Sequence, residues 1–213
     1  MVKGIIFDFD GVIVESTDIK TEAFAKLFEP EGSGIVKKVV SYHKENMGVS
    51  RFEKFRHIYR NILRRKLDNN KFSQLCKKFS SLVLEAVIAA PYVKGAQEFL
   101  RNKSKQYKLF VVSATPHDEI IRIVRRRGIG KIFKAVYGAP LEKRDAVKKI
   151  LRDNKINPQS ALYIGDALRD YLAAEDNGVK FIARIKGNKE IFGKIKCLKI
   201  KDLSGLARIL KAL

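Results

Sequence analysis

Short apolar runs, each bounded by polar residues, recur along most of the chain. They span residues 3–8, 107–112, 135–137, 161–164 and 179–183. From residue 91 onward, segments with apolar residues at helical spacing lie between them. Runs that are apolar at successive positions are typical of strands buried on both faces, as in a parallel sheet. The pattern therefore predicts an α/β fold, with a parallel sheet as the core and helices on both faces.

The first run is followed by a long block that has only helical patterns. Phe24 and Phe28 share one helical face, and similar patterns continue to residue 89. Pro91 ends the block, because the residue before a proline is disfavoured in a helix. We therefore expect a core domain and an all-helical domain inserted after the first strand. The core domain would comprise residues 1–15 and 91–213, and the inserted domain residues 16–90.

The composition is that of a globular protein, with 46% hydrophobic residues in a chain of 213. The longest apolar runs are far too short to cross a membrane. The first residues also lack the charged-then-apolar layout of a signal peptide. We therefore expect a cytoplasmic protein without a membrane partner, either a monomer or a homodimer.

The net charge of the chain is unusually high. Lysine and arginine number 44 against 23 aspartates and glutamates, which gives a formal net charge of +21. Such a charge attracts anions, and phosphorylated metabolites, nucleic acid and acidic membranes are candidates. The basic residues are spread along the chain, without an aromatic-interleaved RNA motif or zinc-finger spacing. A solvated basic surface is therefore the simpler interpretation, and nucleic acid is the less favoured partner.

Two carboxylates, Asp8 and Asp10, leave the first predicted strand two residues apart, and Gly11 follows them. In open α/β sheets, ligands bind beyond the carboxyl ends of the strands, where these side chains fall. An aspartate can attack phosphorus to form an aspartyl-phosphate, and a second carboxyl group can protonate the leaving oxygen and then deprotonate water. The alternative is a β-hairpin, because Asp-Gly between two apolar runs is a common hairpin turn.

Two further segments place polar side chains at strand ends. Ser113 and Thr115 follow the second apolar run, where a hydroxyl can bind a phosphoryl oxygen or cap the next helix. Lys143 lies at a predicted helix start, where its charge can neutralise a transferring phosphoryl group. Arg144 is a rival for that role. Each of these two segments is weak evidence when taken alone.

Asp166 follows the apolar run at 161–164, and Asp170 lies one helical turn further on the same face. A carboxylate after a buried strand suits a hard, oxygen-seeking cation. The alternative for Asp166 is an ordinary helix N-cap. The order of the four segments, together with the helical insertion, favours one catalytic site over four unrelated local features.

These segments resemble the four motifs of the haloacid dehalogenase superfamily. The resemblance covers nearly the whole chain and rests mainly on Asp8-Phe9-Asp10-Gly11-Val12 and Gly165-Asp166-x-x-x-Asp170. It implies a Rossmann-like core and a small helical cap of the C1 type, similar to the phosphoglycolate phosphatase and β-phosphoglucomutase branch.

The resemblance also implies catalytic roles. Asp8 would be the nucleophile and Asp10 the general acid and base. Lys143 would pair with Asp8 and with the phosphoryl group, although its surroundings depart from the Gly-Lys-Pro pattern common in this branch. Ser113, with the neighbouring Ala114, would hold the phosphoryl group.

The implied cofactor is Mg²⁺. Asp8, the backbone carbonyl of Asp10 and the side chain of Asp166 would hold the ion. Asp170 would act from behind these ligands or as a further ligand. Gly11, within the first motif, would belong to the phosphate-binding set.

A segment of the helical insertion, Met47-Gly48-Val49-Ser50-Arg51, resembles the specificity loop of the same branch. A glycine there lets the backbone approach the substrate. Arg51 would contact a distal anionic or hydroxyl group of the substrate. The alternative is a helix start, with Ser50 as its N-cap.

The implied activity is Mg²⁺-dependent hydrolysis of a small anionic phosphorylated substrate, phosphoglycolate or a sugar phosphate. A dehalogenase has no leaving alkoxide to protonate, so Asp10 argues against that activity. A phosphosugar mutase of the β-phosphoglucomutase type would keep all these residues. Phosphonate hydrolysis would need an insertion lysine able to form a Schiff base, and none stands out. The net charge leaves a nucleic-acid end phosphatase as a further alternative.

Overall fold

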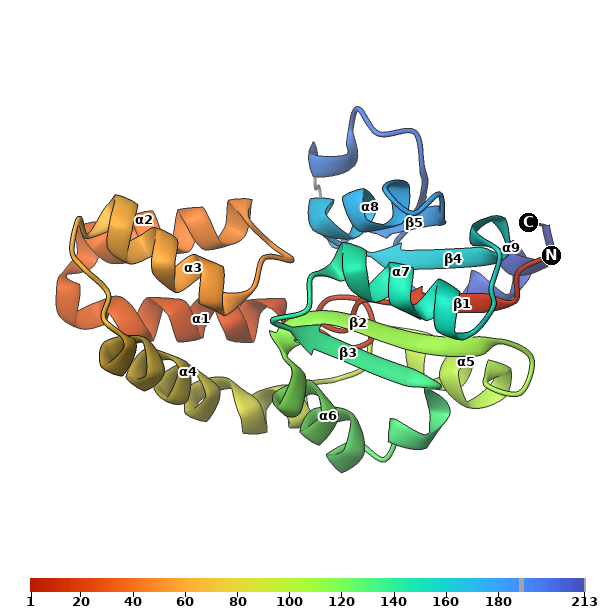
Figure 1. Ribbon diagram of the computed structural model, residues 1–213, viewed down its shortest axis with the longest axis horizontal. Helices are drawn as coiled ribbons and strands as arrows, with labels where there is room; N and C mark the ends of the chain where they lie inside the picture. The colour runs from red at the N-terminus through yellow and green to blue at the C-terminus, as the bar shows by residue number, and fades with distance from the viewer. Residues whose placement is uncertain (188–189, 213) are drawn as a thin grey trace.

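The computed structural model describes residues 1–187 and 190–212 (Figure 1). Positions 188, 189 and 213 of the expected core domain lie outside the described residues. Within the described residues, six parallel strands form one sheet in the order β3-β2-β1-β4-β5-β6. The strands are β1 (Gly4–Phe7), β2 (Lys108–Pro116), β3 (Ala135–Ala139), β4 (Ala161–Gly165), β5 (Lys180–Arg184) and β6 (Leu198–Ile200).

Helices cover both faces of the sheet and extend beyond one of its edges. They are α1 (Thr17–Phe28), α2 (Ser33–Glu45), α3 (Arg51–His57), α4 (Asn69–Ala89), α5 (Ala96–Lys103), α6 (His117–Arg126), α7 (Lys143–Asp153), α8 (Leu168–Glu175) and α9 (Leu206–Ala212). Short helical turns occur at Glu29–Glu31, Ile58–Ile62, Gly130–Ile132, Pro158–Ser160 and Glu190–Phe192. None of the described helices is both long and apolar enough to span a membrane.

The two faces of the sheet bury different sets of side chains. Because side chains alternate along a strand, Ile5 and Phe7 of β1 point to one face and Ile6 to the other. Ile5 and Phe7 join a hydrophobic cluster with side chains of α5, α6 and α9. Ile6 packs in a separate cluster with side chains of α7 and α8. The predicted α/β fold, with a parallel sheet covered on both faces, is therefore confirmed.

Helices α1 to α4 stand together beyond the carboxyl ends of the strands, on the left of Figure 1. We call this group, residues 17–89, the cap. Its interior is aromatic: the ring centroid of Phe24 lies 4.6 Å from that of Phe79 and 5.7 Å from that of Phe55. Val87, near the end of α4, continues this apolar interior into the core. The cap therefore packs on the sheet domain through a continuous hydrophobic cluster.

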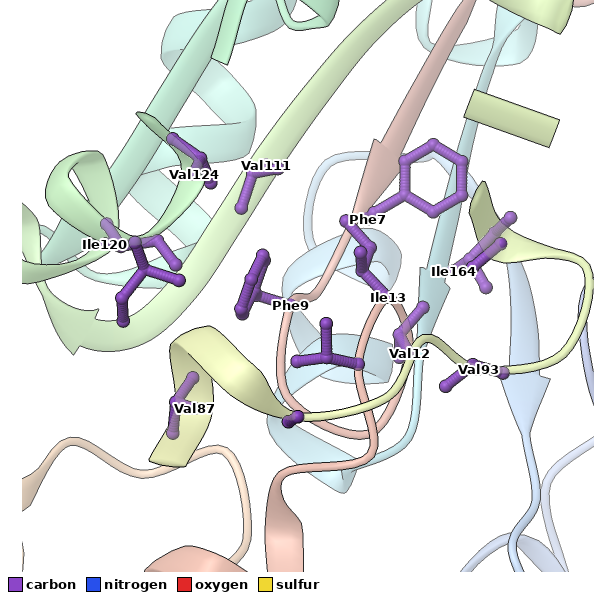
Figure 2. Packing of buried hydrophobic residues seen from close by; sticks show 14 of the residues in the cluster. Phe7, Phe9, Val12, Ile13, Val87, Val93, Val111, Ile120, Val124 and Ile164 are labelled. Atoms are coloured by element: carbon purple, nitrogen blue, oxygen red, sulfur yellow. The ribbon is translucent and has the colours of Figure 1, made fainter. Parts of the chain in front are cut away.

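The loop after β1 is anchored by buried side chains, as Figure 2 shows. Phe9, Val12 and Ile13 turn back into the cluster that also holds Val93 and Ile120. Residues 11–13 form a turn, and β1 pairs in parallel with both β2 and β4. The hairpin alternative is therefore wrong, and the polar side chains between these anchors are held at the sheet edge.

Strand β6 was not predicted from the sequence. It has only three residues, two of them exposed, and it lies at the edge of the sheet beyond β5. A short edge strand with polar positions lacks the continuous apolar run that identified the others. The sheet is therefore one strand wider than the sequence pattern indicated.

Two neighbouring isoleucines of α6 test the packing of the core. Ile120 is fully buried, whereas Ile121 is 39% exposed. Ile120→Ala should lower the free energy of unfolding by about 2–5 kcal/mol, because it leaves a cavity in a packed cluster. Ile121→Ala is the matched control and should cost about 1 kcal/mol or less. Urea unfolding of both variants measures the difference, and equal losses would contradict the described packing.

Candidate active site

Segments far apart in the sequence meet at the carboxyl edge of the sheet, beneath the cap (Figure 1). Asp8 follows β1, Asp166 follows β4, and Lys143 begins α7. A cavity of about 50 Å³ lies there, with Asp8, Asp10 and Asp166 on its core side and side chains of the cap opposite. The site is therefore enclosed between the two parts of the molecule.

Asp8 is buried at the core side of this cavity. Its Oδ1 accepts a hydrogen bond from the Phe9 N–H at 2.7 Å, and its Oδ2 lies 3.1 Å from Lys143 Nζ. Burial raises the pKa of Asp8 well above its usual value, and the carboxylates of Asp170 and Asp166 add to that rise against the opposing charge of Lys143. A further cation near Asp8 would favour the ionised carboxylate, which is the nucleophilic form.

Three buried carboxylates converge at this point. Oxygen atoms of Asp8, Asp166 and Asp170 all lie within 4.8 Å of one another. Like charges so close repel, so a divalent cation with a preference for oxygen ligands fits the group. The residues present are therefore suited to Mg²⁺.

Asp170 is engaged differently from the other two carboxylates. Its Oδ1 accepts hydrogen bonds from Lys143 Nζ at 2.6 Å and from the Tyr163 hydroxyl at 2.8 Å. Its Oδ2 accepts from the Ala167 N–H at 3.1 Å. Asp8 and Asp166 line the cavity, whereas Asp170 lies behind it. This arrangement favours Asp170 as the group that positions Lys143 over Asp170 as a direct metal ligand.

Gly11 lets the backbone pass close to the Asp166 carboxylate. Its φ is +77°, a conformation that side chains disfavour. A Cβ at this position would lie 2.4 Å from Asp166 Oδ2 and 2.8 Å from the Thr17 side chain. The glycine therefore shapes the carboxylate cluster through the close approach of the turn.

Asp10 is tied to the cap by a network of hydrogen bonds. Lys20 of α1 forms an ion pair with Asp10 and donates to Thr115 Oγ1 at 2.7 Å. Ser16 and Thr115 donate to Asp10 at 2.6 and 3.1 Å. Burial alone would raise the pKa of Asp10. The charge of Lys20, together with hydrogen bonds from Lys20, Ser16 and Thr115, outweighs this effect and lowers the pKa. Asp10 is therefore ionised while Lys20 holds it.

Lys143, not Arg144, occupies the buried position at the start of α7. Arg144 is exposed and lies 3.6 Å from the exposed carboxylate of Asp145. Burial alone would lower the pKa of Lys143. The carboxylates of Asp170 and Asp8 have the larger opposite effect together, so the pKa lies well above its usual value. Lys143 is therefore a fixed positive charge beside Asp8.

Ser113 is buried next to Lys143, at a neighbouring cavity of about 270 Å³ that shares Ala114 with the first. Ser113 Oγ accepts a hydrogen bond from the Thr115 N–H at 3.1 Å. The residue before α6 is Pro116, which has no side-chain cap hydrogen bond. Neither Ser113 nor Thr115 therefore caps the following helix, and both hydroxyls stay at the site.

Arg51 joins the cap to the core. Ser50 caps α3, as the alternative expected, with its Oγ accepting from the Glu53 N–H at 3.3 Å. The Arg51 guanidinium forms two hydrogen bonds to Glu119 of α6, at 2.6 and 2.9 Å, and one to Ser80 at 2.7 Å. Arg51 also lines the cavity. Its charge is balanced within the protein by Glu119.

Lys54 stands out among the cap lysines, although no pattern in the sequence singled it out. It is 3% exposed, lines the cavity and contacts His43 Nδ1 at 2.9 Å. Burial lowers the pKa of Lys54 to about 7, with contributions from Lys20 and Lys143. Burial, with the charges of Lys54 and other lysines, likewise lowers the pKa of His43 to about 2. His43 is therefore neutral at physiological pH.

Sequence reasoning missed Lys20, Thr115 as a partner of Asp10, Tyr163 and Lys54. Lys20 is one of many lysines in helical patterns, and Tyr163 lies within an apolar run that predicts a buried strand. The position of Lys54 on the buried face of α3, three residues after Arg51, is the one available signal. Which of these side chains reach the site depends on how the cap packs on the sheet.

Comparison with known proteins places the chain in a family. The family model for haloacid dehalogenase-like hydrolases matches residues 5–184. The chain belongs to this family. The expected resemblance and the expectation of a hydrolase are therefore confirmed.

Individual relatives are similar over most of their length. A phosphorylated carbohydrates phosphatase from Thermotoga maritima is 27% identical over 85% of this chain and 84% of its own. A phosphoglycolate phosphatase from Synechococcus elongatus is 25% identical over 85% and 83% of the two chains. Among solved structures, β-phosphoglucomutase from Clostridium difficile superimposes with a TM-score of 0.80 at 20% identity, over 99% of this chain and 96% of that one.

The buried lysine of the cap gives a pH-dependent stability. Unfolding returns the pKa of Lys54 from about 7 to 10.5, so the unfolded chain binds the extra proton between these values. The stability of the wild type therefore rises with pH across this window, and the full cost of charging Lys54 is present below it. Lys54→Met should remove this dependence.

We expect the free energy of unfolding of Lys54→Met, relative to the wild type, to fall by about 3 kcal/mol between pH 6.5 and 9.5. Urea unfolding at several pH values measures it. Lys38→Met, which removes an exposed lysine of α2, is the control and should follow the wild type. Parallel curves for wild type and Lys54→Met would contradict the described burial.

Proposed function

We propose that this enzyme is a Mg²⁺-dependent phosphomonoesterase that hydrolyses a small phosphorylated metabolite through an aspartyl-phosphate at Asp8. Phosphoglycolate and sugar phosphates are the candidate substrates. The observation that carries the proposal is the convergence of Asp8, Asp10 and Asp166 on one cavity, with Lys143 Nζ 3.1 Å from Asp8 Oδ2. The phosphatase activity of the two curated relatives supports the same conclusion.

Asp8 and Asp166, with the Asp10 backbone carbonyl, would hold the Mg²⁺, and Asp170 would hold Lys143. When bound, the ion would neutralise charge on the transferring phosphoryl oxygens and on the nucleophile. Lys143 supplies a second, permanent positive charge 3.1 Å from Asp8 Oδ2. Repulsion between an anionic nucleophile and an anionic substrate is thereby reduced.

The chemistry proceeds in two displacements at phosphorus. An Asp8 carboxylate oxygen forms a bond to phosphorus in line with the leaving oxygen, whose bond breaks while Asp10 gives it a proton. Asp10 then takes a proton from water, whose oxygen attacks the aspartyl-phosphate and releases inorganic phosphate with free Asp8. The ion pair with Lys20 lowers the pKa of Asp10 and so disfavours this proton. Displacement of Lys20 from Asp10 would therefore favour the first step.

A phosphosugar mutase is the second candidate, because the likeness to β-phosphoglucomutase extends over the whole fold. Both activities use the same first displacement. They differ in the acceptor of the phosphoryl group, which is water for the phosphatase and a sugar hydroxyl for the mutase. A nucleic-acid end phosphatase is less favoured, since the basic residues are spread along the chain without an aromatic-interleaved RNA motif or zinc-finger spacing.

Phosphate release from a panel of phosphomonoesters tests the proposal. The panel comprises phosphoglycolate, hexose phosphates, nucleotides and a 3′-phosphorylated oligonucleotide. We expect release that requires Mg²⁺, stops with EDTA and falls at least about 10³-fold in Asp8→Asn, because the nucleophile is lost.

The distribution of activity over the panel separates the candidates. Release from no compound would contradict the phosphatase. A long-lived phosphoenzyme that transfers its phosphoryl group to a hexose phosphate would assign the mutase. Preferred hydrolysis of the oligonucleotide would assign the end phosphatase instead.

The ion pair between Lys20 and Asp10 predicts a shift in the pH profile. Lys20 lowers the pKa of Asp10, so Lys20→Gln should raise that pKa and keep Asp10 protonated to higher pH. The limb on which kcat/KM falls with rising pH should therefore move upward by about one unit. The control is Lys26→Gln, an exposed lysine on the same helix. An unchanged profile in Lys20→Gln would contradict the role given to this pair.

A further inference from the structure

Three basic side chains of the cap face the cavity, and two of them have acidic partners. Lys20 pairs with Asp10, and Arg51 pairs with Glu119. Lys54 contacts only the imidazole of His43 among the hydrogen-bond and ion-pair partners found in the described residues. A buried amine without a counter-ion is costly, because burial disfavours the charged form. Among the described residues, Lys54 is therefore a basic group at the cavity that no carboxylate contacts directly.

His43 presents a second unsatisfied group at the same place. It is 3% exposed and lines the cavity, its ring lies 4.6 Å from that of Phe24, and its Nε2 has no hydrogen-bond partner in the described part of the chain. When the Lys54 ammonium donates to Nδ1, the neutral ring carries its proton on Nε2. A buried N–H donor without an acceptor then lies beside a buried ammonium. Nδ1 and Nε2 point in diverging directions, so a single anion would pair with Lys54, while His43 holds the amine in place.

We propose that Lys54, held in place by His43, forms a binding site for a second anionic group of the substrate, a carboxylate or a second phosphate. The proposal rests on the proposed function, in which the first phosphate is attacked by Asp8. Lys54 and Asp8 line the same cavity of about 50 Å³, so one compact molecule would reach both. The enzyme would then select small phosphomonoesters that carry two anionic groups.

The other cap side chains at the cavity argue against a polyhydroxylated substrate. Phe24 and Phe79 are apolar, and no cap residue that lines this cavity carries a carboxylate or an amide. Sugar hydroxyls donate hydrogen bonds as well as accept them, and on the cap side of this cavity only Thr17 offers a side-chain oxygen, so a hexose would find few acceptors there. A carboxylate accepts hydrogen bonds from Lys54 without donating any. The site therefore fits phosphoglycolate better than a hexose phosphate.

Occupation of this site would change the protonation of Lys54. The charged groups that act on it are Lys20 of α1, Glu53 of α3, Lys143 of α7, and Asp10 after β1, with His43 of α2 in contact. An anion beside Lys54 raises the pKa of the amine from about 7. Near pH 7.5 the complex should therefore take up a proton from solution. A neutral group in the same place would not cause this uptake.

Calorimetry on the Asp8→Asn protein with Mg²⁺ tests the site without turnover. Phosphoglycolate is compared with 2-hydroxyethyl phosphate, which has the same phosphate but no second anion. Titrations at pH 7.5 in HEPES and in Tris, whose ionisation enthalpies differ, measure the protons taken up. We expect phosphoglycolate to bind at least tenfold tighter and to take up about half a proton more.

Variants on the same background assign the effect to the two residues. Lys54→Met should bring the affinity for phosphoglycolate to within about threefold of that for 2-hydroxyethyl phosphate and abolish the additional proton uptake. Lys54→Arg should keep the preference for phosphoglycolate over 2-hydroxyethyl phosphate without the additional proton uptake. His43→Phe should weaken the binding of phosphoglycolate but not that of 2-hydroxyethyl phosphate. Lys38→Met is the exposed control and should change nothing. Circular dichroism checks that each variant is folded.

The outcomes separate this inference from the proposed function. If both compounds bind and Lys54→Met leaves their affinity ratio unchanged, the second-anion site is overturned while the phosphatase stands. If neither compound binds, the phosphomonoester site fails and the second-anion site fails with it. Reduction with borohydride that links Lys54 to an aldehyde-bearing phosphonate would assign Lys54 to imine chemistry and overturn the anion site.

Discussion

Carboxylates buried at one edge of the sheet are the constraint on which the rest of the site depends. Asp8, Asp166 and Asp170 bring acidic oxygens within 4.8 Å of one another, and Lys143 is the cation placed among them. Repulsion between these groups would scatter flexible side chains. Here the strand ends, the α7 terminus and the packed turn after β1 fix their positions. The fold thus creates a binding site for a cation at the place where a phosphoryl group would be transferred.

The cap places basic side chains opposite this acidic edge, and only some of them form ion pairs with carboxylates of the core. Lys20 and Arg51 reach across to Asp10 and Glu119 of the core, so two charge pairs join the parts of the molecule. Within the described residues, Lys54 has no carboxylate among its hydrogen-bond or ion-pair partners. Pairs that join cap and core can be exchanged for contacts with a ligand, which couples cap position to binding. In the proposed anion site, Lys54 gives the cavity a preference for substrates that carry a second anionic group.

Much of the fold could be predicted because its strands are central and fully buried. The continuous apolar runs at residues 4–7 and 161–164 have no other favourable place than the middle of a covered sheet. Strand β6 escaped prediction because an exposed edge strand of three residues has no such run. The Asp-Gly turn after β1 suggested a hairpin, and only the parallel pairing on both sides of β1 excluded it.

The sequence by itself determined the α/β class, the helical insertion and the order in which Asp8, Ser113, Lys143 and Asp166 occur near the carboxyl ends of successive strands. These properties are local, since they depend on periodicity and on residue types at strand ends. Tertiary structure decided the rest: Arg51 lies against Glu119, Lys20 holds Asp10, and Lys54 is buried beside His43. Such contacts join residues up to 68 positions apart. They are set by how the helices of the cap pack on one another and on the sheet, which no local pattern encodes.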